Sequence, residues 1–111
     1  MYLFRVMVQV THMKDTQLPL DCGGAFVGVY IRAKSIREAI DISEAELLDD
    51  KYKPIRTYEA VEIDVEDLTD KNEEYASEGD PNSSDLIDIY NNGGLWYAAF
   101  NTYPTEEEQW Q

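Results

Sequence analysis

The segment Tyr2–Thr11 alternates regularly, and this pattern constrains the fold more than any other feature of the chain. Successive side chains of a β-strand point to opposite faces, so an alternating run predicts a strand that buries one face. The apolar face comprises Tyr2, Phe4, Val6, Val8 and Val10. A chain that begins with such a strand is expected to build a sheet.

Two further segments alternate in the same way. Residues 25–33 are predicted to form the second strand, after a loop over residues 12–24 that contains a proline and a glycine pair. Residues 55–65 are predicted to form the third strand. In the third strand we expect Val61, Ile63 and Val65 to point inward. We expect Glu62 and Asp64 to point outward.

Residues 35–50 are predicted to form an amphipathic helix. Ser35 and Glu38 have the spacing of a capping box, in which each side chain accepts a hydrogen bond from the other residue's backbone N–H. Residues at helical spacing then give one stripe that faces the core. The stripe comprises Ile36, Ala39, Ile40, Ser43 and Leu47. Pro54 prevents the helix from continuing.

Residues 84–103 support two interpretations. In the first, residues 86–90 and 95–103 are strands of a hairpin, because the Asn-Asn-Gly-Gly sequence between them tolerates the positive φ of such turns. In the second, residues 84–90 form a short helix that is capped by Ser83 or Ser84 and ends at Gly93. The hairpin is our main prediction.

Together these elements predict one α+β domain over residues 1–104. We expect an antiparallel sheet of four to five strands with one principal amphipathic helix packed on one face, in the order β-β-α-β-loop-β-β. The loop is the acidic segment 66–84, which we expect to be solvated. The acidic tail, residues 105–111, is expected to be frayed.

The net charge of −14 lies entirely in the second half of the chain. Residues 1–56 carry eight basic and eight acidic side chains, whereas residues 57–111 carry fifteen acids and only Lys71 as a base. Such a field attracts basic partners and repels nucleic acid and anionic membranes. We therefore expect a basic protein partner, no direct contact with nucleic acid and no membrane association. Without an apparent signal peptide or membrane span, a cytoplasmic location is expected.

No motif in the sequence identifies a reaction. The single cysteine and single histidine exclude an internal disulfide framework and a multi-cysteine zinc site. Cys22 and His12 share one loop, but no local signature of a catalytic pair surrounds them. The spacing of an EF-hand and the glycine motifs of phosphate-binding loops are also absent. The sequence therefore predicts a protein that is not an enzyme and that uses no metal or cofactor.

Aromatic side chains accompany the acids in the second half. In protein interfaces aromatic residues anchor the contact, while charged residues steer the approach of the partner. We therefore expect the binding surface to combine both kinds of residue. The candidate contact residues are Glu62, Asp64, Glu66, Asp67, Asp70, Glu73, Glu74, Tyr75, Asp85, Asp88, Trp96 and Tyr97.

In size, acidity and expected architecture, the whole chain resembles the immunity proteins of bacterial polymorphic toxin and contact-dependent growth inhibition systems. The resemblance involves no shared motif, so no functional residue is carried over from it. It implies that the chain binds and neutralises a basic cognate toxin domain, such as a nuclease. We expect the protein to be a monomer or a weak dimer.

Other hypotheses remain open at this point. The main alternative is a nucleic-acid mimic of the anti-restriction or anti-CRISPR type, whose carboxylates would occupy a DNA-binding groove. Glu59, Glu62, Asp64 and Glu66 would supply a partial row of negative charges along one strand. A regulatory or accessory subunit without a toxin partner is a third hypothesis. The fourth hypothesis is that the acidic residues only keep the domain soluble.

Overall fold

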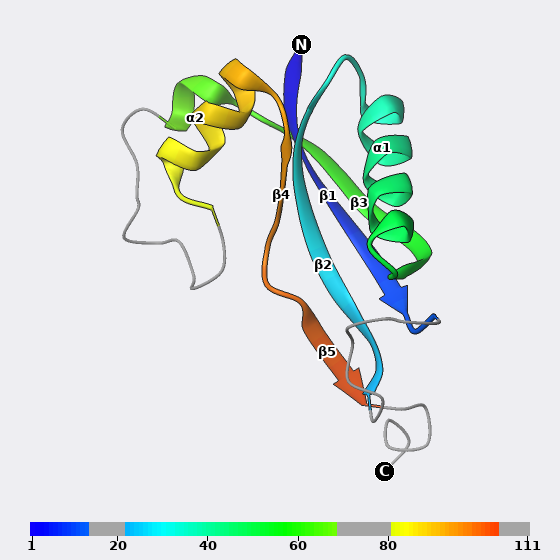
Figure 1. Ribbon diagram of the computed structural model, residues 1–111. Helices are drawn as coiled ribbons and strands as arrows, with labels where there is room; N and C mark the ends of the chain where they lie inside the picture. Colours follow the sequence, from blue (N-terminus) through cyan, green and yellow to red (C-terminus); the bar gives the residue numbers. More distant parts are fainter. Residues whose placement is uncertain (14–21, 69–80, 105–111) are drawn as a thin grey trace.

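The structure is a computed structural model, which describes residues 1–13, 22–68 and 81–104 (Figure 1). Within these residues, five strands form an antiparallel sheet with an α-helix on each face, which confirms the predicted α+β class. The elements are β1 (Tyr2–Thr11), β2 (Cys22–Ala33), α1 (Ile36–Asp49), β3 (Lys53–Ile63), the 3-10 helix η1 (Val65–Leu68), α2 (Ser83–Asn92), β4 (Leu95–Tyr97) and β5 (Asn101–Pro104). None of the helices in this part of the chain is long and apolar enough to span a membrane.

The sheet has the strand order β3-β1-β2-β4, and β5 also pairs with β2. β1 pairs antiparallel with β2 on one side and with β3 on the other. β4 pairs with residues 29–31 of β2, and β5 pairs with residues 22–26. β3 therefore forms one edge of the sheet, and β4 and β5 share the other edge (Figure 1).

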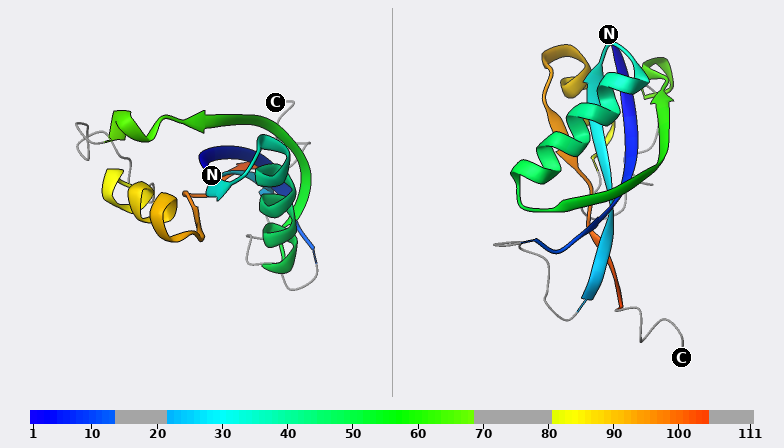
Figure 2. Two further views of the ribbon diagram at one scale, coloured as in Figure 1. Left: turned by 90° about the horizontal axis from the view of Figure 1, so that it is seen from above. Right: turned by 90° about the vertical axis from the view of Figure 1, so that its right-hand side faces the viewer.

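The main core lies between α1 and one face of the sheet (Figure 2). The alternation in β1 is confirmed, because Phe4, Val6, Val8 and Val10 are buried on this face. α1 contributes a fully buried stripe. Its members are Ala39, Ser43 and Leu47. At the start of α1, Ser35 Oγ accepts the predicted bond from Glu38 N–H at 3.1 Å. The Glu38 carboxylate, however, accepts from Lys34 N–H at 3.3 Å and not from Ser35.

α2 covers one end of the opposite face of the sheet, where Leu3 packs with Leu86 and Ile89. The hairpin prediction is wrong, and the alternative helix is confirmed, although neither Ser83 nor Ser84 is its N-cap. Its N-cap is Asn82, whose side chain accepts from Asp85 N–H at 2.8 Å while the Asp85 carboxylate accepts from Asn82 N–H at 3.1 Å. Gly93 ends the helix with a φ of 84°.

The segment after α2 is not the single strand over residues 95–103 that we predicted. β4 and β5 are separated by residues 98–100, and Ala98 N–H donates to the Gly28 carbonyl at 2.8 Å within this break. Tyr97 and Phe100 both pack against the α1 core, although strict alternation would place them on opposite faces. The break therefore lets two aromatic residues three positions apart cover the same core.

β3 departs from regular alternation because it contains two β-bulges relative to β1. The extra residues of the bulges are Ile55 and Tyr58, which are paired with no residue of β1. As a result the less exposed positions of β3 recur every third residue instead of every second one. The prediction that Val61 points inward is wrong, since its side chain is 37% exposed. Ile63 is half-buried, as expected, but it packs with the α2 cluster and not with α1.

Candidate functional site

An acidic hollow of about 260 Å³ lies where β3 leads into η1. Three of the predicted contact acids, Glu62, Asp64 and Glu66, line it. The hollow is lined by Met1, Tyr2, Leu3, Glu62, Ile63, Asp64, Val65, Glu66 and Tyr90. Three carboxylates and no lysine or arginine side chain occur among these lining residues, so the charged side chains of the hollow are all negative.

Local backbone chemistry brings the three acids together. The Asp64 carboxylate accepts a hydrogen bond from Glu66 N–H at 3.0 Å, which turns the chain out of β3 and into η1. Ile63 and Val65 alternate with the acids and pack against the α2 cluster. The apolar residues thereby anchor the segment, and the three carboxylates remain exposed to solvent.

Two tyrosines complete the hollow. Tyr2 is 49% exposed, and Tyr90 is half-buried on α2. A phenol ring beside carboxylates suits a guanidinium or an ammonium group, because the cation can stack on the ring while its N–H groups bond to the carboxylates. The hollow is therefore chemically suited to a cationic side chain.

Sequence reasoning did not include either tyrosine among the contact residues. The alternation predicts that Tyr2 lies on the apolar face of the first strand, and the incorrect hairpin prediction places Tyr90 in a strand. Tyr90 follows Leu86 by four positions, so the helical interpretation would have placed both residues on the same side of α2. That spacing is the signal that would have identified Tyr90.

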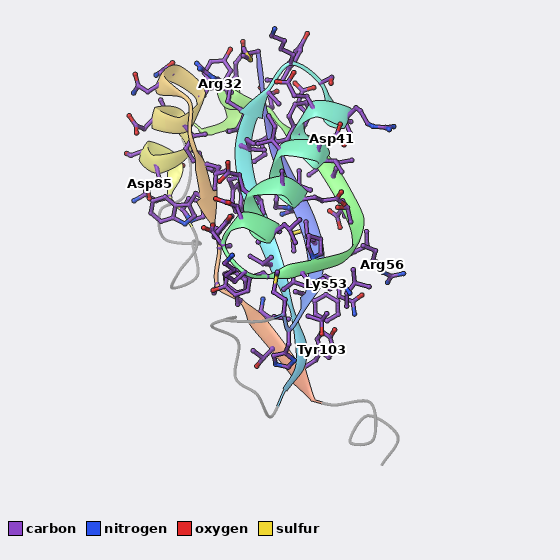
Figure 3. The ribbon with its side chains drawn as sticks, turned by 45° about the vertical axis from the view of Figure 1, so that its right-hand side comes forward. Arg32, Asp41, Lys53, Arg56, Asp85 and Tyr103 are labelled. Atoms are coloured by element: carbon purple, nitrogen blue, oxygen red, sulfur yellow. The ribbon has the colours of Figure 1, made fainter. Side chains whose placement is uncertain are left out.

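α2 carries two further predicted acids beside η1, with which it is in contact. Asp85 is half-buried and forms the capping box of the helix, so its carboxylate has a structural role. Asp88 is exposed and accepts a hydrogen bond from Asn92 Nδ2 at 2.6 Å. Asp88 therefore adds negative charge to the exposed surface of α2, whereas Asp85, which Figure 3 labels, stabilises the start of the helix.

The two predicted aromatic residues of β4 lie on opposite faces of the sheet. Trp96 is 37% exposed, and it pairs with Tyr30 on the face away from α1. Tyr97 packs against the α1 core, and its hydroxyl donates to Asp50 Oδ2 at 2.7 Å. Burial raises the pKa of Tyr97, and the bond to Asp50 raises it further. Neither residue lines the acidic hollow.

The remaining predicted residues cannot be assigned to the hollow. Asp70, Glu73, Glu74 and Tyr75 lie outside the described residues, as does the side chain of Asp67. Within the part of the chain that the structure describes, no group of three histidine, cysteine, aspartate or glutamate side chains is arranged to hold a metal ion.

A second hollow, of about 330 Å³, lies on the face of the sheet away from α1 and has a different chemistry. Arg5 Nη2 and Glu59 Oε1 form an ion pair at 2.9 Å on its wall. Gly28 lines this hollow beside Met7. A side chain at position 28 would occupy part of the space, because its Cβ would lie 3.2 Å from Met7 Sδ. The full lining is Arg5, Met7, Gly28, Tyr30, Tyr58, Glu59, Ala98, Ala99 and Asn101. This hollow is mixed in charge, so it does not share the preference of the acidic hollow for cations.

The acidic hollow presents carboxylates and phenols, a combination suited to recognising a cation. Comparison of the chain with protein-family models, with curated proteins and with solved structures found no match.

Proposed function

We propose that this chain is a non-catalytic binding protein that captures a basic protein partner, and that this partner is a toxin domain which it neutralises. The observation that carries the proposal is the acidic hollow, in which Glu62, Asp64 and Glu66 meet beside Tyr2 and Tyr90. A hollow of this chemistry receives one arginine or lysine side chain of the partner.

The acids and the aromatic rings have different roles in this proposal. Exposed ion pairs each contribute only about 0–1 kcal/mol, so three exposed carboxylates do not account for tight binding. Their main effect is on the association rate, which electrostatic steering increases and salt reduces. The buried contacts with the tyrosine rings supply the slow dissociation.

The main alternative, a nucleic-acid mimic, needs carboxylates in an extended and regular row. Among the described residues, the partial row that we expected is interrupted. Glu59 pairs with Arg5 on the face away from α1, whereas Glu62 lies opposite Phe4, whose side chain points to the α1 face. This difference favours a binding site for one cationic side chain over an imitation of the phosphate backbone.

The test compares two variants that have the same change in charge. The hollow variant replaces Glu62, Asp64 and Glu66 by lysine. The control variant replaces three exposed acids of α1 by lysine, namely Asp41, Glu46 and Asp49. Both variants and the original chain are used as bait for proteins of the source cell at low salt, and the bound proteins are identified by mass spectrometry.

The proposal predicts one basic protein bound in equal amount by the original chain and the control variant, and lost from the hollow variant. Expression of that protein alone should arrest growth, and co-expression of the original chain should restore it. Equal loss from both triple variants would contradict a specific role for the hollow. Several DNA-binding proteins that added duplex DNA displaces would instead support the mimic.

A further inference from the structure

β3 is an edge strand whose outer side pairs with no other strand of the described residues. Such an edge offers backbone N–H and C=O groups to a further strand. Seven of the eleven residues of β3 are exposed. Three of them are large apolar residues: Ile55 is 50% exposed, Tyr58 is 41% exposed and Val61 is 37% exposed. This strand therefore presents more apolar surface than an edge that faces only water requires.

The charges of β3 are separated along its length. Lys53 and Arg56 lie in its first half, and Glu59 and Glu62 lie in its second half. When two such strands run antiparallel about a two-fold axis, the basic half of each lies beside the acidic half of the other. β3 is therefore electrostatically complementary to a reversed copy of itself.

We propose that two copies of this chain associate through β3, antiparallel and about a two-fold axis, to form one continuous sheet. The side-chain directions are compatible with this arrangement. Thr57 and Ala60 face α1, since Thr57 Oγ1 donates to Glu44 of α1 at 2.7 Å and Ala60 packs against the core. A register with Thr57 opposite Ala60 of the second copy therefore keeps both α1 helices on the same side of the joined sheet.

The same register also matches the opposite face. Arg56, Glu59 and Val61 pair with β1 residues whose side chains point away from α1, and the Tyr58 ring lies 5.6 Å from Phe26 on that face. In this register Tyr58 lies opposite Glu59 of the second copy, and Arg56 lies opposite Val61 of the second copy. Residues of the same face therefore meet from position 56 to position 61.

This register adds a second cation to Glu59. Glu59 already pairs with Arg5 at 2.9 Å. Arg56 of the second copy lies diagonal to Glu59, at a separation of about 7–8 Å between Cα atoms that long side chains span. Figure 3 shows Arg56 extending outward from β3. The exposed Tyr58 and Val61 become covered in the same contact, so apolar burial accompanies the ion pairs.

The order of charges along β3 makes the contact selective. Bulges and charged residues discourage pairing of an edge with unrelated strands. A reversed copy of β3 carries the opposite order of charges, so its basic half meets the acidic half of this edge. The partner that best fits this edge is thus a second copy of the chain.

Sedimentation equilibrium across a range of protein concentrations tests the proposal. The original chain should form dimers, and Arg56→Glu should weaken the dimer by about tenfold or more, because the introduced carboxylate then lies diagonal to Glu59 of the second copy. The double variant Arg56→Glu with Glu59→Arg should recover part of the lost affinity, because the charge order across the contact is restored while the new arginine also lies beside Arg5. Arg37→Glu on α1 is the matched control, since it makes the same change in net charge at an exposed site away from the edge.

Amide hydrogen exchange of the original chain supplies an independent measurement. Exchange of β3 amides should slow as the protein concentration rises, while amides of α1 should not respond. A chain that remains monomeric up to about 1 mM overturns the proposal. So does an Arg56→Glu variant that dimerises as well as the Arg37→Glu control.

Discussion

Substitution by alanine is expected to have opposite effects at Ser43 of α1 and at Ser35, the N-cap of the same helix. Ser43 is fully buried, and its hydroxyl has no hydrogen-bond partner among the described residues. Ser35 is the exposed N-cap, whose hydroxyl accepts from Glu38 N–H at 3.1 Å. We expect Ser43→Ala to raise the free energy of unfolding and Ser35→Ala to lower it.

The magnitudes follow from these environments. A buried polar group without a partner costs about 1–3 kcal/mol, and alanine is favoured over serine within a helix by about 0.5 kcal/mol. The oxygen atom removed from Ser43 also made packing contacts, which offset part of the gain. We therefore expect Ser43→Ala to stabilise the protein by about 1–2 kcal/mol. Loss of the cap in Ser35→Ala should destabilise it by about 1 kcal/mol.

Urea unfolding followed by circular dichroism measures both changes, because a shift in midpoint at constant slope reports stability alone. In a domain of this size, 1 kcal/mol corresponds to a change of about 4–8 °C in Tm. If Ser43→Ala destabilises the protein by about 1 kcal/mol, the reasoning is refuted. The Ser43 hydroxyl would then bond the carbonyl of Ala39, one turn earlier in the helix.

Three further predictions concern other parts of the fold. Above about pH 10, the original chain should lose stability more steeply than Tyr97→Phe, because burial and Asp50 raise the pKa of Tyr97 and only the unfolded chain then ionises. Leu86→Ala should lower the free energy of unfolding, measured by urea unfolding, by about 2–4 kcal/mol, because the Leu86 side chain is only 7% exposed on the buried side of α2. Gly93→Ala and Gly94→Ala should each lower Tm, because their φ angles are 84° and 95°. The effect should be larger at Gly93, where a Cβ would also meet an arginine side chain at 2.9 Å.

The strongly periodic elements were predictable because one physical signal dominates each of them. β1 has the bounds that its alternation predicted, and α1 begins directly after the predicted capping serine. In both cases the apolar positions decide the element, because burying them stabilises only one conformation. The second strand was also predicted, although it begins three residues earlier, at Cys22.

α2 was less predictable because its sequence satisfies two patterns. Leu86 and Ile89 are three positions apart, which suits one face of a helix, but the Asn-Asn-Gly-Gly sequence that follows also suits the turn of a hairpin. Tertiary structure decides between the patterns. Leu3 lies on the face of β1 that we expected to be more polar, and it is fully buried against α2. The need to cover this face could not be judged from residues 84–90 alone.

The candidate site was predicted only where the acids are adjacent in sequence. Glu62, Asp64 and Glu66 line one hollow, and the Asp64 side chain turns the chain immediately after β3. The bulges of β3, at Ile55 and Tyr58, leave no comparable signal in the sequence. A bulge depends on how two strands fit each other, so alternation within one strand does not reveal it.

Glu62 belongs to both surfaces proposed for this protein, and this overlap separates the two proposals experimentally. Glu62 lines the acidic hollow, and it is also the second acid of the β3 edge. Asp64→Lys with Glu66→Lys changes the hollow but lies beyond β3, so it should weaken partner binding and leave the dimer intact. Arg56→Glu should have the reverse effect, because Arg56 does not line the hollow. Glu62→Lys should weaken both, and if it weakens only one, the surface that it leaves unaffected does not include Glu62.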